Sequence, residues 1–319
     1  MKISVVMSTY NGSRYILEQL QSLVKQTKMP DEVLIIDDCS TDNTYDIVSA
    51  FIKKCGLENW KIIRNKKNQG WQTNFANGID LCSGDIIFTC DQDDIWLKDK
   101  IESMVYILSK DSQIKLLAGD YILLEERSGK FFEKNIFKNS EGTVEKKVFD
   151  ERFFYVQRPG CVYAFKRELW ELAKRYTFKN NPHDALLWRT ANLIDGLYLY
   201  RKPVILWRRH KNAQTNGVAA STREKQIDWC NYVQNVIKSM NQIANEHDIY
   251  GLKQKSNYID KFSELIKIKK RVYQKESLLL QCRTWMYYKY YPTNKGPFGE
   301  TIRVLKMILY KGKNNEKNH

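Results

Sequence analysis

Residues 85–96 read DIIFTCDQDDIW, an apolar run followed at once by three carboxylates. A short apolar run bounded by a turn is typical of a strand buried inside a parallel sheet. Asp91, Asp93 and Asp94 come where such a strand ends. We therefore predict a buried strand over residues 85–90 and a cluster of carboxylates at its carboxyl end.

The same pattern occurs twice earlier in the chain. Residues 3–8 and 32–37 are apolar runs, and polar residues follow both of them. Four more strands are predicted at 60–64, 114–119, 162–165 and 203–207, and amphipathic helices at 13–25, 42–54 and 96–108. Strands that alternate with helices predict an α/β fold, a mostly parallel sheet with helices on both faces.

Ligands of an open parallel sheet bind outside the carboxyl ends of its strands, so the three polar segments should line one crevice. Three carboxylates within four residues repel one another unless a cation lies among them. A hard divalent ion, Mg²⁺ or Mn²⁺, prefers such oxygen ligands. The alternative is a solvated acidic turn that caps the helix expected at 96–108.

Four motifs carry a family resemblance. They are SVVMSTYNGSRYILEQLQSLVKQT at 4–27, LIIDDCSTDNT at 34–44, NQGWQTNFANGI at 68–79 and GDIIFTCDQDDIW at 84–96. In this order they closely resemble family-two glycosyltransferases of the GT-A (Rossmann-like) fold. DQDDIW, with PHDALLW at 182–188 and LWRRHKNAQTN at 206–216, resembles the branch of bacterial rhamnosyltransferases and related capsule and O-antigen enzymes. The resemblance extends over about residues 1 to 215.

The resemblance implies a nucleotide site. Ser8, Thr9, Tyr10 and Asn11 would form the loop that packs on the base. Asp38 matches the carboxylate that accepts the imide N–H of a pyrimidine. Because a carboxylate cannot donate a hydrogen bond, this residue would select uracil or thymine over cytosine. The alternative for Asp37 and Asp38 is capping at the entry of the helix at 42–54.

The resemblance also implies roles in metal and diphosphate binding. Asp93 matches the carboxylate near the ribose and the metal, Asp94 matches the direct metal ligand, and Asp91 would share either role. Arg208, Arg209 and His210 follow the strand at 203–207, where they would neutralise diphosphate or, through His210, bind the metal. The alternative is a basic loop at a strand end.

An inverting transfer needs a base on the acceptor side of the sugar. Asp184 lies about 90 residues after the acidic cluster, where the resemblance places the catalytic carboxylate at the start of a helix. As an isolated residue it would be a helix cap. His183 stands where the family often has Glu, and it would orient the carboxylate, touch the sugar or simply begin the helix. Gly160 would let a sugar or acceptor approach the backbone, or would form a turn after Pro159.

The remaining sequence defines a second region. Residues 252–319 contain 16 Lys/Arg and 5 Asp/Glu in a helical, aromatic stretch, an excess of eleven positive charges. We expect a GT-A domain at 1–220 and a basic helical region at 221–319. The basic helices would contact an anionic membrane, or would be a solvated face over a packed core. Seven scattered cysteines without metal spacing favour a reducing cytoplasm. Membrane contact by the basic helices would attach the protein peripherally to the inner face of the membrane.

The sequence thus predicts an inverting, metal-dependent glycosyltransferase. Its nucleotide-sugar donor would carry UDP or dTDP, with dTDP-rhamnose the first expectation, and its acceptor would be a surface polysaccharide or a lipid-linked glycan. Two alternatives are an inactive glycan- or nucleotide-binding relative and a nucleotidyltransferase, although the phosphate loop usual in the latter is absent. The net positive charge alone would suit a nucleic-acid partner. The sequence contains no recognised nucleic-acid-binding motif, so we expect no such partner.

Overall fold

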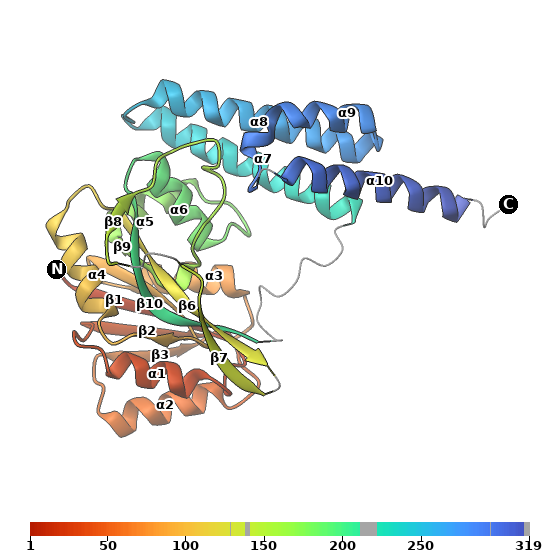
Figure 1. Cartoon of the computed structure of the whole chain (residues 1–319). Coiled ribbons are helices and arrows are strands. Elements are labelled where there is room, and N and C mark those ends of the chain that lie inside the picture. Colours follow the sequence, from red (N-terminus) through yellow and green to blue (C-terminus); the bar gives the residue numbers. More distant parts are fainter. Residues whose placement is uncertain (128, 138–140, 211–221, 294, 316–319) are drawn as a thin grey trace. The chain divides into compact units, whose positions relative to one another are not determined.

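A computed structural model describes residues 1–127, 129–137, 141–210, 222–293 and 295–315, with side chains to residue 309 (Figure 1). The chain forms two compact units. The first contains Met1–Lys147 and Val156–Gln214, and the second contains Val148–Tyr155 and Thr215–His319. The boundary predicted at residue 220 lies outside the described residues. The eight-residue segment Val148–Tyr155 groups with the second unit, although it comes from the middle of the sequence.

The first unit is built on a ten-stranded mixed sheet. Its first half is parallel and runs in the order β3-β2-β1-β4. These strands are β1 (Ile3–Thr9), β2 (Glu32–Asp37), β3 (Trp60–Arg64) and β4 (Ile86–Asp91). All four occur where the apolar runs predict them. β1, β2 and β4 are buried on both faces, which requires apolar side chains, whereas β3 is a mostly exposed edge strand.

The second half of the sheet contains antiparallel pairs that the sequence does not predict. β9 (Tyr163–Lys166) runs antiparallel to both β4 and β6. The other strands are β5 (Ile95–Trp96), β6 (Leu116–Arg127), β7 (Lys130–Asn135), β8 (Val144–Lys146) and β10 (Leu197–Arg209). β6 is longer than expected because it continues past Gly119 as a partly exposed ribbon. β10 is longer because the mostly buried residues Leu197–Tyr200 also pair with β6.

Helices cover both faces of the sheet. Figure 1 shows α1 (Ile16–Val24) and α2 (Thr44–Cys55) on one face and α3 (Trp71–Leu81), α5 (Arg167–Ala173) and α6 (His183–Leu193) on the other. α4 spans Lys100–Lys110. The prediction of a helix from residue 96 is therefore wrong at its start. Ile95 and Trp96 pair with β10, so the helix begins four residues later.

The register of the parallel strands brings the polar segments together. Ser8 at the end of β1 pairs with Asp91 at the end of β4, and Thr9 pairs with Asp37 at the end of β2. All three strands therefore stop at one edge of the sheet. Behind this edge lies a continuous apolar core that includes Val6 and Phe88, both fully buried. The core fixes the backbone from which the polar loops project.

The second unit is helical. It comprises α7 (Arg223–Glu246), α8 (Leu252–Lys275), α9 (Leu278–Arg283), a 3₁₀ segment at Thr284–Tyr290 and α10 (Gly296–Asn315). Phe153 and Phe154 pack on Phe262 of α8, with ring centroids 5.5 Å and 5.0 Å away, which explains why residues 148–155 belong to this unit. No helix within the described ranges is both long enough and apolar enough to cross a lipid bilayer.

Candidate functional site

The end of β4 carries a cluster of carboxylates with few partners. Asp94 is only 1% exposed, and its Oδ1 accepts a hydrogen bond of 2.9 Å from the backbone N–H of Arg208. Its Oδ2 is buried without a hydrogen-bond partner among the described residues. Burying a carboxylate oxygen without a hydrogen bond costs free energy, so a ligand at this atom would stabilise the folded protein. The alternative of a solvated acidic turn is wrong for Asp94, because its side chain is buried.

A thiol and an ammonium group lie against the cluster. Ligand atoms of Asp91, Asp94 and Cys161 all lie within 4.8 Å of one another. Lys100 is fully buried, donates to the Cys161 carbonyl at 2.6 Å and lies 3.5 Å from the centre of the Trp96 ring. Burial lowers the pKa of Lys100 to about 8. One lysine therefore balances only part of the charge of the cluster.

The crowding raises the pKa values of these carboxyls. Burial, with the nearby charges of Asp93 and Asp184, raises the pKa of Asp91 to about 7. Burial, followed by Asp93 and Asp91, raises the pKa of Asp94 well above its usual range. Burial and the same carboxylates raise the pKa of the Cys161 thiol, which therefore stays protonated. Carboxyl groups that resist ionisation near neutral pH are the ones that a cation would stabilise.

The donor set fits a hard divalent cation. The open Oδ2 of Asp94 and the adjacent carboxyl of Asp91 supply oxygen, the ligand that Mg²⁺ and Mn²⁺ prefer. Cys161 is a poor ligand for such an ion because its sulfur is soft and protonated. Asp91 and Asp94 are thus the residues that would hold a metal.

The end of β10 and the next residue, His210, contact Asp93 and Asp94. His210 Nε2 lies 2.8 Å from Asp93 Oδ2, and its ring packs on Tyr15 at 4.7 Å. Arg208 binds the site through three groups, because besides its N–H its Nε donates to the Asp93 carbonyl at 2.7 Å and its Nη2 pairs with Glu18. Arg208 therefore fixes both Asp93 and Asp94, a structural role that its place after the predicted strand did not indicate. Arg209 instead lies over the Trp207 ring, 4.8 Å from its centre.

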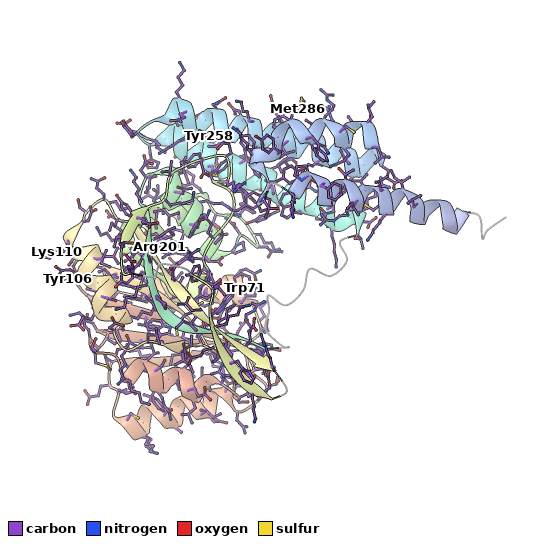
Figure 2. All side chains as sticks on the ribbon, viewed as in Figure 1. Trp71, Tyr106, Lys110, Arg201, Tyr258 and Met286 are labelled. Carbon is purple, nitrogen blue, oxygen red and sulfur yellow. The ribbon has the colours of Figure 1, made fainter. Side chains whose placement is uncertain are left out.

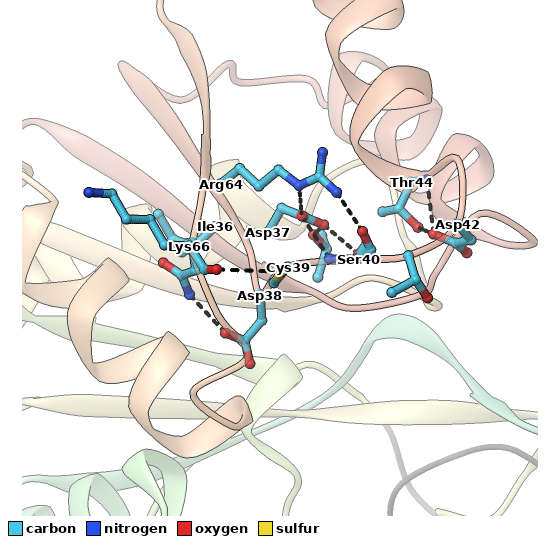
Figure 3. Close-up of polar contacts among 12 residues, drawn as sticks. Ile36, Asp37, Asp38, Cys39, Ser40, Asp42, Thr44, Arg64 and Lys66 are labelled. Carbon is cyan, nitrogen blue, oxygen red and sulfur yellow. Dashed lines mark hydrogen bonds and ion pairs between the residues drawn. The ribbon is translucent and has the colours of Figure 1, made fainter.

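The acidic pair after β2 has a different environment (Figure 3). Asp37 is fully buried, and its oxygens accept from the Ser40 N–H at 3.0 Å, the Ser40 hydroxyl at 2.5 Å and the Thr9 hydroxyl at 3.2 Å. Arg64 Nε lies 3.5 Å from the same carboxylate. Asp37 therefore holds the loop that follows β2. It does not cap α2, since Asp42 makes the local turn by accepting from the Thr44 N–H at 3.0 Å.

Asp38 is also almost saturated by the protein. Its Oδ1 accepts from Asn65 Nδ2 at 2.8 Å and from the Gln69 N–H at 2.9 Å, and its Oδ2 accepts from the Gly70 N–H at 2.9 Å. A carboxylate offers about four lone-pair sites. Three are used here, so Asp38 can accept one more hydrogen bond. This residue holds the 65–70 loop and keeps one acceptor for a ligand.

The loop after β1 is held by both neighbouring loops. The Ser8 hydroxyl accepts from Asn74 Nδ2 at 2.7 Å, and the Asn11 side chain accepts from the Thr41 N–H at 2.8 Å. Gln92, between the acidic residues, accepts from the Tyr10 N–H at 2.9 Å and donates to the Tyr10 carbonyl at 3.1 Å. Gln92 had no predicted role, but these two bonds clamp the first motif to the last. The Tyr10 side chain is 40% exposed and free to meet a ligand.

Asp184, His183 and Gly160 lie together. Asp184 is half-buried in the first turn of α6, where its Oδ1 accepts from the Ala185 N–H at 2.7 Å. A Cβ at position 160 would lie 2.9 Å from Asp184 Cβ and 3.3 Å from His183 Nε2. Glycine is therefore needed at this position so that α6 can approach, and the turn expected after Pro159 is a short 3₁₀ helix. The Gly160 carbonyl accepts from the Thr89 hydroxyl of β4 at 2.6 Å, which connects α6 to the acidic strand.

His183 is a buried imidazole that packs against aromatic rings. Its side chain is 4% exposed, and neither ring nitrogen has a hydrogen bond within the described part of the chain. The ring stacks on Phe75 at 4.2 Å and meets the edge of Trp71 at 6.1 Å, both from α3 (Figure 2 labels Trp71). Burial lowers the pKa of His183, so the ring is neutral at pH 7. One N–H and one bare nitrogen remain to be satisfied.

Comparison with known proteins identifies the family of the chain. The model of Glycosyl transferase family 2 matches residues 4–160. The dTDP-rhamnosyl transferase RfbG of Shigella flexneri is 31% identical over 260 residues, which span 75% of this chain and 85% of RfbG. The chain belongs to glycosyl transferase family 2. The resemblance found in the four motifs is thereby confirmed.

Solved structures identify the fold. A crystal structure of S. aureus TarS 1-349 in complex with UDP-GlcNAc matches with a TM-score of 0.61 at 17% identity, over 95% of this chain and 81% of that one. A structure of GalNAc-T7 with UDP, GalNAc and Mn²⁺ matches with a TM-score of 0.55 at 14% identity, over 74% and 48%. At these identities the likeness concerns the fold alone. The fold of this family 2 glycosyltransferase is GT-A, as predicted.

Proposed function

We propose that this family 2 enzyme is a metal-dependent, inverting glycosyltransferase that uses a pyrimidine diphosphate sugar. One observation carries the proposal. Asp94 Oδ2 is buried with no hydrogen-bond partner among the described residues, and it lies beside Asp91 at the edge of the sheet where β2 ends and the loop with Asp38 begins. A nucleotide held by the β1 and β2 loops would present its diphosphate toward these carboxyls. Mn²⁺ or Mg²⁺, when bound there, would neutralise the departing diphosphate.

The nucleotide would be bound by residues of the first three motifs. Tyr10 offers an exposed ring to the base, and the remaining acceptor site of Asp38 suits the imide N–H of uracil or thymine. Ser8, Thr9 and Asn11 would act mainly by shaping the loop, because their side chains bind other parts of the protein. Asp93, oriented by His210, would face the ribose and the metal.

Asp184 is the proposed catalytic base. It is half-buried in the first turn of α6, and its charge contributes to the raised pKa of Asp91, so it lies near the acidic cluster. A carboxylate there can accept the proton of the attacking acceptor hydroxyl. His183, with both nitrogens unsatisfied, would exchange hydrogen bonds with a sugar hydroxyl, and Gly160 permits this packing. Arg209 would lie at the edge of the diphosphate site.

For the sugar donor we propose dTDP-rhamnose first and UDP-hexoses second. The first choice is supported by the similarity to the dTDP-rhamnosyl transferase of Shigella flexneri over most of both chains. The second is supported by the fold shared with TarS in complex with UDP-GlcNAc. The acceptor would be a surface polysaccharide or a lipid-linked glycan at the cytoplasmic leaflet. The catalytic domain would comprise residues 1–220, and residues 221–319 would form a separate helical region.

The proposal is tested by a screen of nucleotide sugars for hydrolysis in the presence and absence of Mn²⁺. We expect slow, metal-dependent release of dTDP or UDP from one donor. Binding of nucleotide without hydrolysis or transfer would favour an inactive relative. Release of pyrophosphate from a nucleoside triphosphate and a sugar phosphate would instead identify a nucleotidyltransferase.

A further inference from the structure

Helix α10 carries a row of exposed apolar side chains. The row consists of Phe298, Ile302, Leu305 and Leu309, which are 59%, 38%, 39% and 66% exposed. At about 100° per residue, these four positions fall within an arc of about 60° on the helix. Val304, which is 2% exposed, lies on the side that packs into the unit. An aligned row of large apolar groups, unlike single scattered ones, marks a surface that binds something.

We call the row of Phe298, Ile302, Leu305 and Leu309 the α10 face. The indole of Trp285 borders it. Trp285 Nε1 donates to the Thr301 hydroxyl of α10 at 3.2 Å. The indole therefore lies against the helix at the residue that precedes Ile302. Its side chain remains 46% exposed. The next residue, Met286, is 69% exposed and is labelled at the surface of the helical unit in Figure 2. Trp and aliphatic residues together are typical of helices that lie in the interface of a membrane.

The charge of this segment has one sign at the surface. Residues 278–315 contain seven basic residues and one acidic residue, Glu300. Glu300 is 4% exposed, accepts from the Tyr273 hydroxyl at 2.6 Å and from the Tyr291 hydroxyl at 2.5 Å, and lies 3.0 Å from Lys269 Nζ. The only carboxylate of the segment is therefore neutralised inside the unit. Lys306 and Arg303 are exposed and lie on one side of the apolar row, about 40° and 100° around the helix from Ile302.

We propose that the α10 face binds an anionic lipid surface, with the helix lying in the plane of the interface. This inference rests on the proposed function, since it would hold the enzyme beside a lipid-linked acceptor. The apolar row would enter the acyl boundary while Arg303 and Lys306 reach the headgroups. A second copy of the chain is a poorer occupant, because two such faces would bring like charges together. α10 does not span a bilayer, which agrees with a helix that lies flat.

The test measures cosedimentation of the full chain with vesicles of phosphatidylcholine alone and of phosphatidylcholine with 30% phosphatidylglycerol. The wild type should bind only the anionic vesicles. Arg303→Glu/Lys306→Glu should lower the partition coefficient by roughly tenfold or more, since each basic group near an anionic surface contributes severalfold. Ile302→Ser/Leu305→Ser should lower it by a similar factor, and its binding should not be recovered at low salt.

A matched control is Lys261→Glu/Lys267→Glu, which makes the same change in net charge at two exposed positions of α8. It should lose much less binding than the α10 variant. Equal losses would overturn the proposal in favour of attraction by total charge. A wild type that ignores vesicles, or a dimer that the serine variant converts to a monomer, would also overturn it. Far-UV circular dichroism and thermal unfolding of each variant check that the helical unit folds. Nucleotide binding, measured without vesicles, separates failure of this inference from failure of the proposed function.

Discussion

Two acidic loops, after β2 and after β4, lie at the same edge of the sheet in opposite electrostatic states. Asp37 and Asp38 accept hydrogen bonds from Ser40, Thr9, Asn65 and the 65–70 backbone. Asp94, after β4, has one oxygen with no hydrogen-bond partner in the described part of the chain, and its pKa is raised by burial and by its acidic neighbours. Carboxylates of similar burial can thus be structural or ligand-binding, and the hydrogen-bond count separates the two.

The largest expected effect concerns the base. Asp184→Asn keeps the shape of the side chain but removes its ability to accept a proton, so transfer should fall by about 10²-fold or more. Binding of the nucleotide-sugar donor should be unchanged, because the metal site and the β1 and β2 loops are intact. Steady-state kinetics and calorimetry on the same preparation measure both. Turnover equal to that of the wild type would place the base elsewhere, with His183 the next residue to test.

The two loops should differ in stability when a matched pair of isosteric variants is compared without metal. Asp37→Asn replaces an acceptor that holds Ser40, Thr9 and Arg64, and should lower the free energy of unfolding by about 3 kcal/mol. Asp94→Asn keeps an oxygen for the Arg208 N–H and replaces a carboxyl whose ionised form is costly to bury, so its effect should be within about 1 kcal/mol. Urea denaturation at pH 7.5 measures both values, and equal losses would refute the contrast.

The pH dependence of the metal-free protein should report on Asp91. Its pKa is about 7 in the folded chain, above the value of about 3.9 expected when unfolded. The stability linked to this group is complete below about pH 4 and is lost as the pH rises to about 7, because the unfolded state releases its proton first. The melting temperature should fall over this range by several degrees more in the wild type than in Asp91→Asn. Mn²⁺ at pH 7.5 should reverse the loss, and parallel curves for the two proteins would contradict the assignment.

The smallest expected effect concerns the clamp between the motifs. Gln92→Ala removes both hydrogen bonds to the backbone of Tyr10 but leaves every carboxylate in place. Nucleotide affinity should fall by about tenfold or less, the scale of one or two hydrogen bonds, while kcat is kept. Gln72→Ala, a partly exposed change on α3, is the control. A loss of kcat without loss of affinity would mean that Gln92 acts on the chemistry instead.

The sequence predicts β1 to β4 and the acidic edge because apolar runs and strand-end residues are local signals. β7 and β8 could not be predicted, since their side chains are largely exposed and only pairing with β6 and β10 forms them. The roles of Arg208 and Gln92 depend on partners 82 to 190 residues away, which spacing does not reveal. The hydrogen bonds that Asp37 accepts and the unsatisfied Oδ2 of Asp94 are likewise properties of the folded chain.

The most direct test of the account is titration of Mn²⁺ in the presence of UDP, by calorimetry, into the wild type, Asp94→Asn and Asp37→Asn. We predict one metal site in the wild type, the same site in folded Asp37→Asn, and no metal-dependent binding in Asp94→Asn. Equal Mn²⁺ binding by Asp94→Asn and the wild type would contradict the claim that the unsatisfied carboxyls after β4 hold the metal.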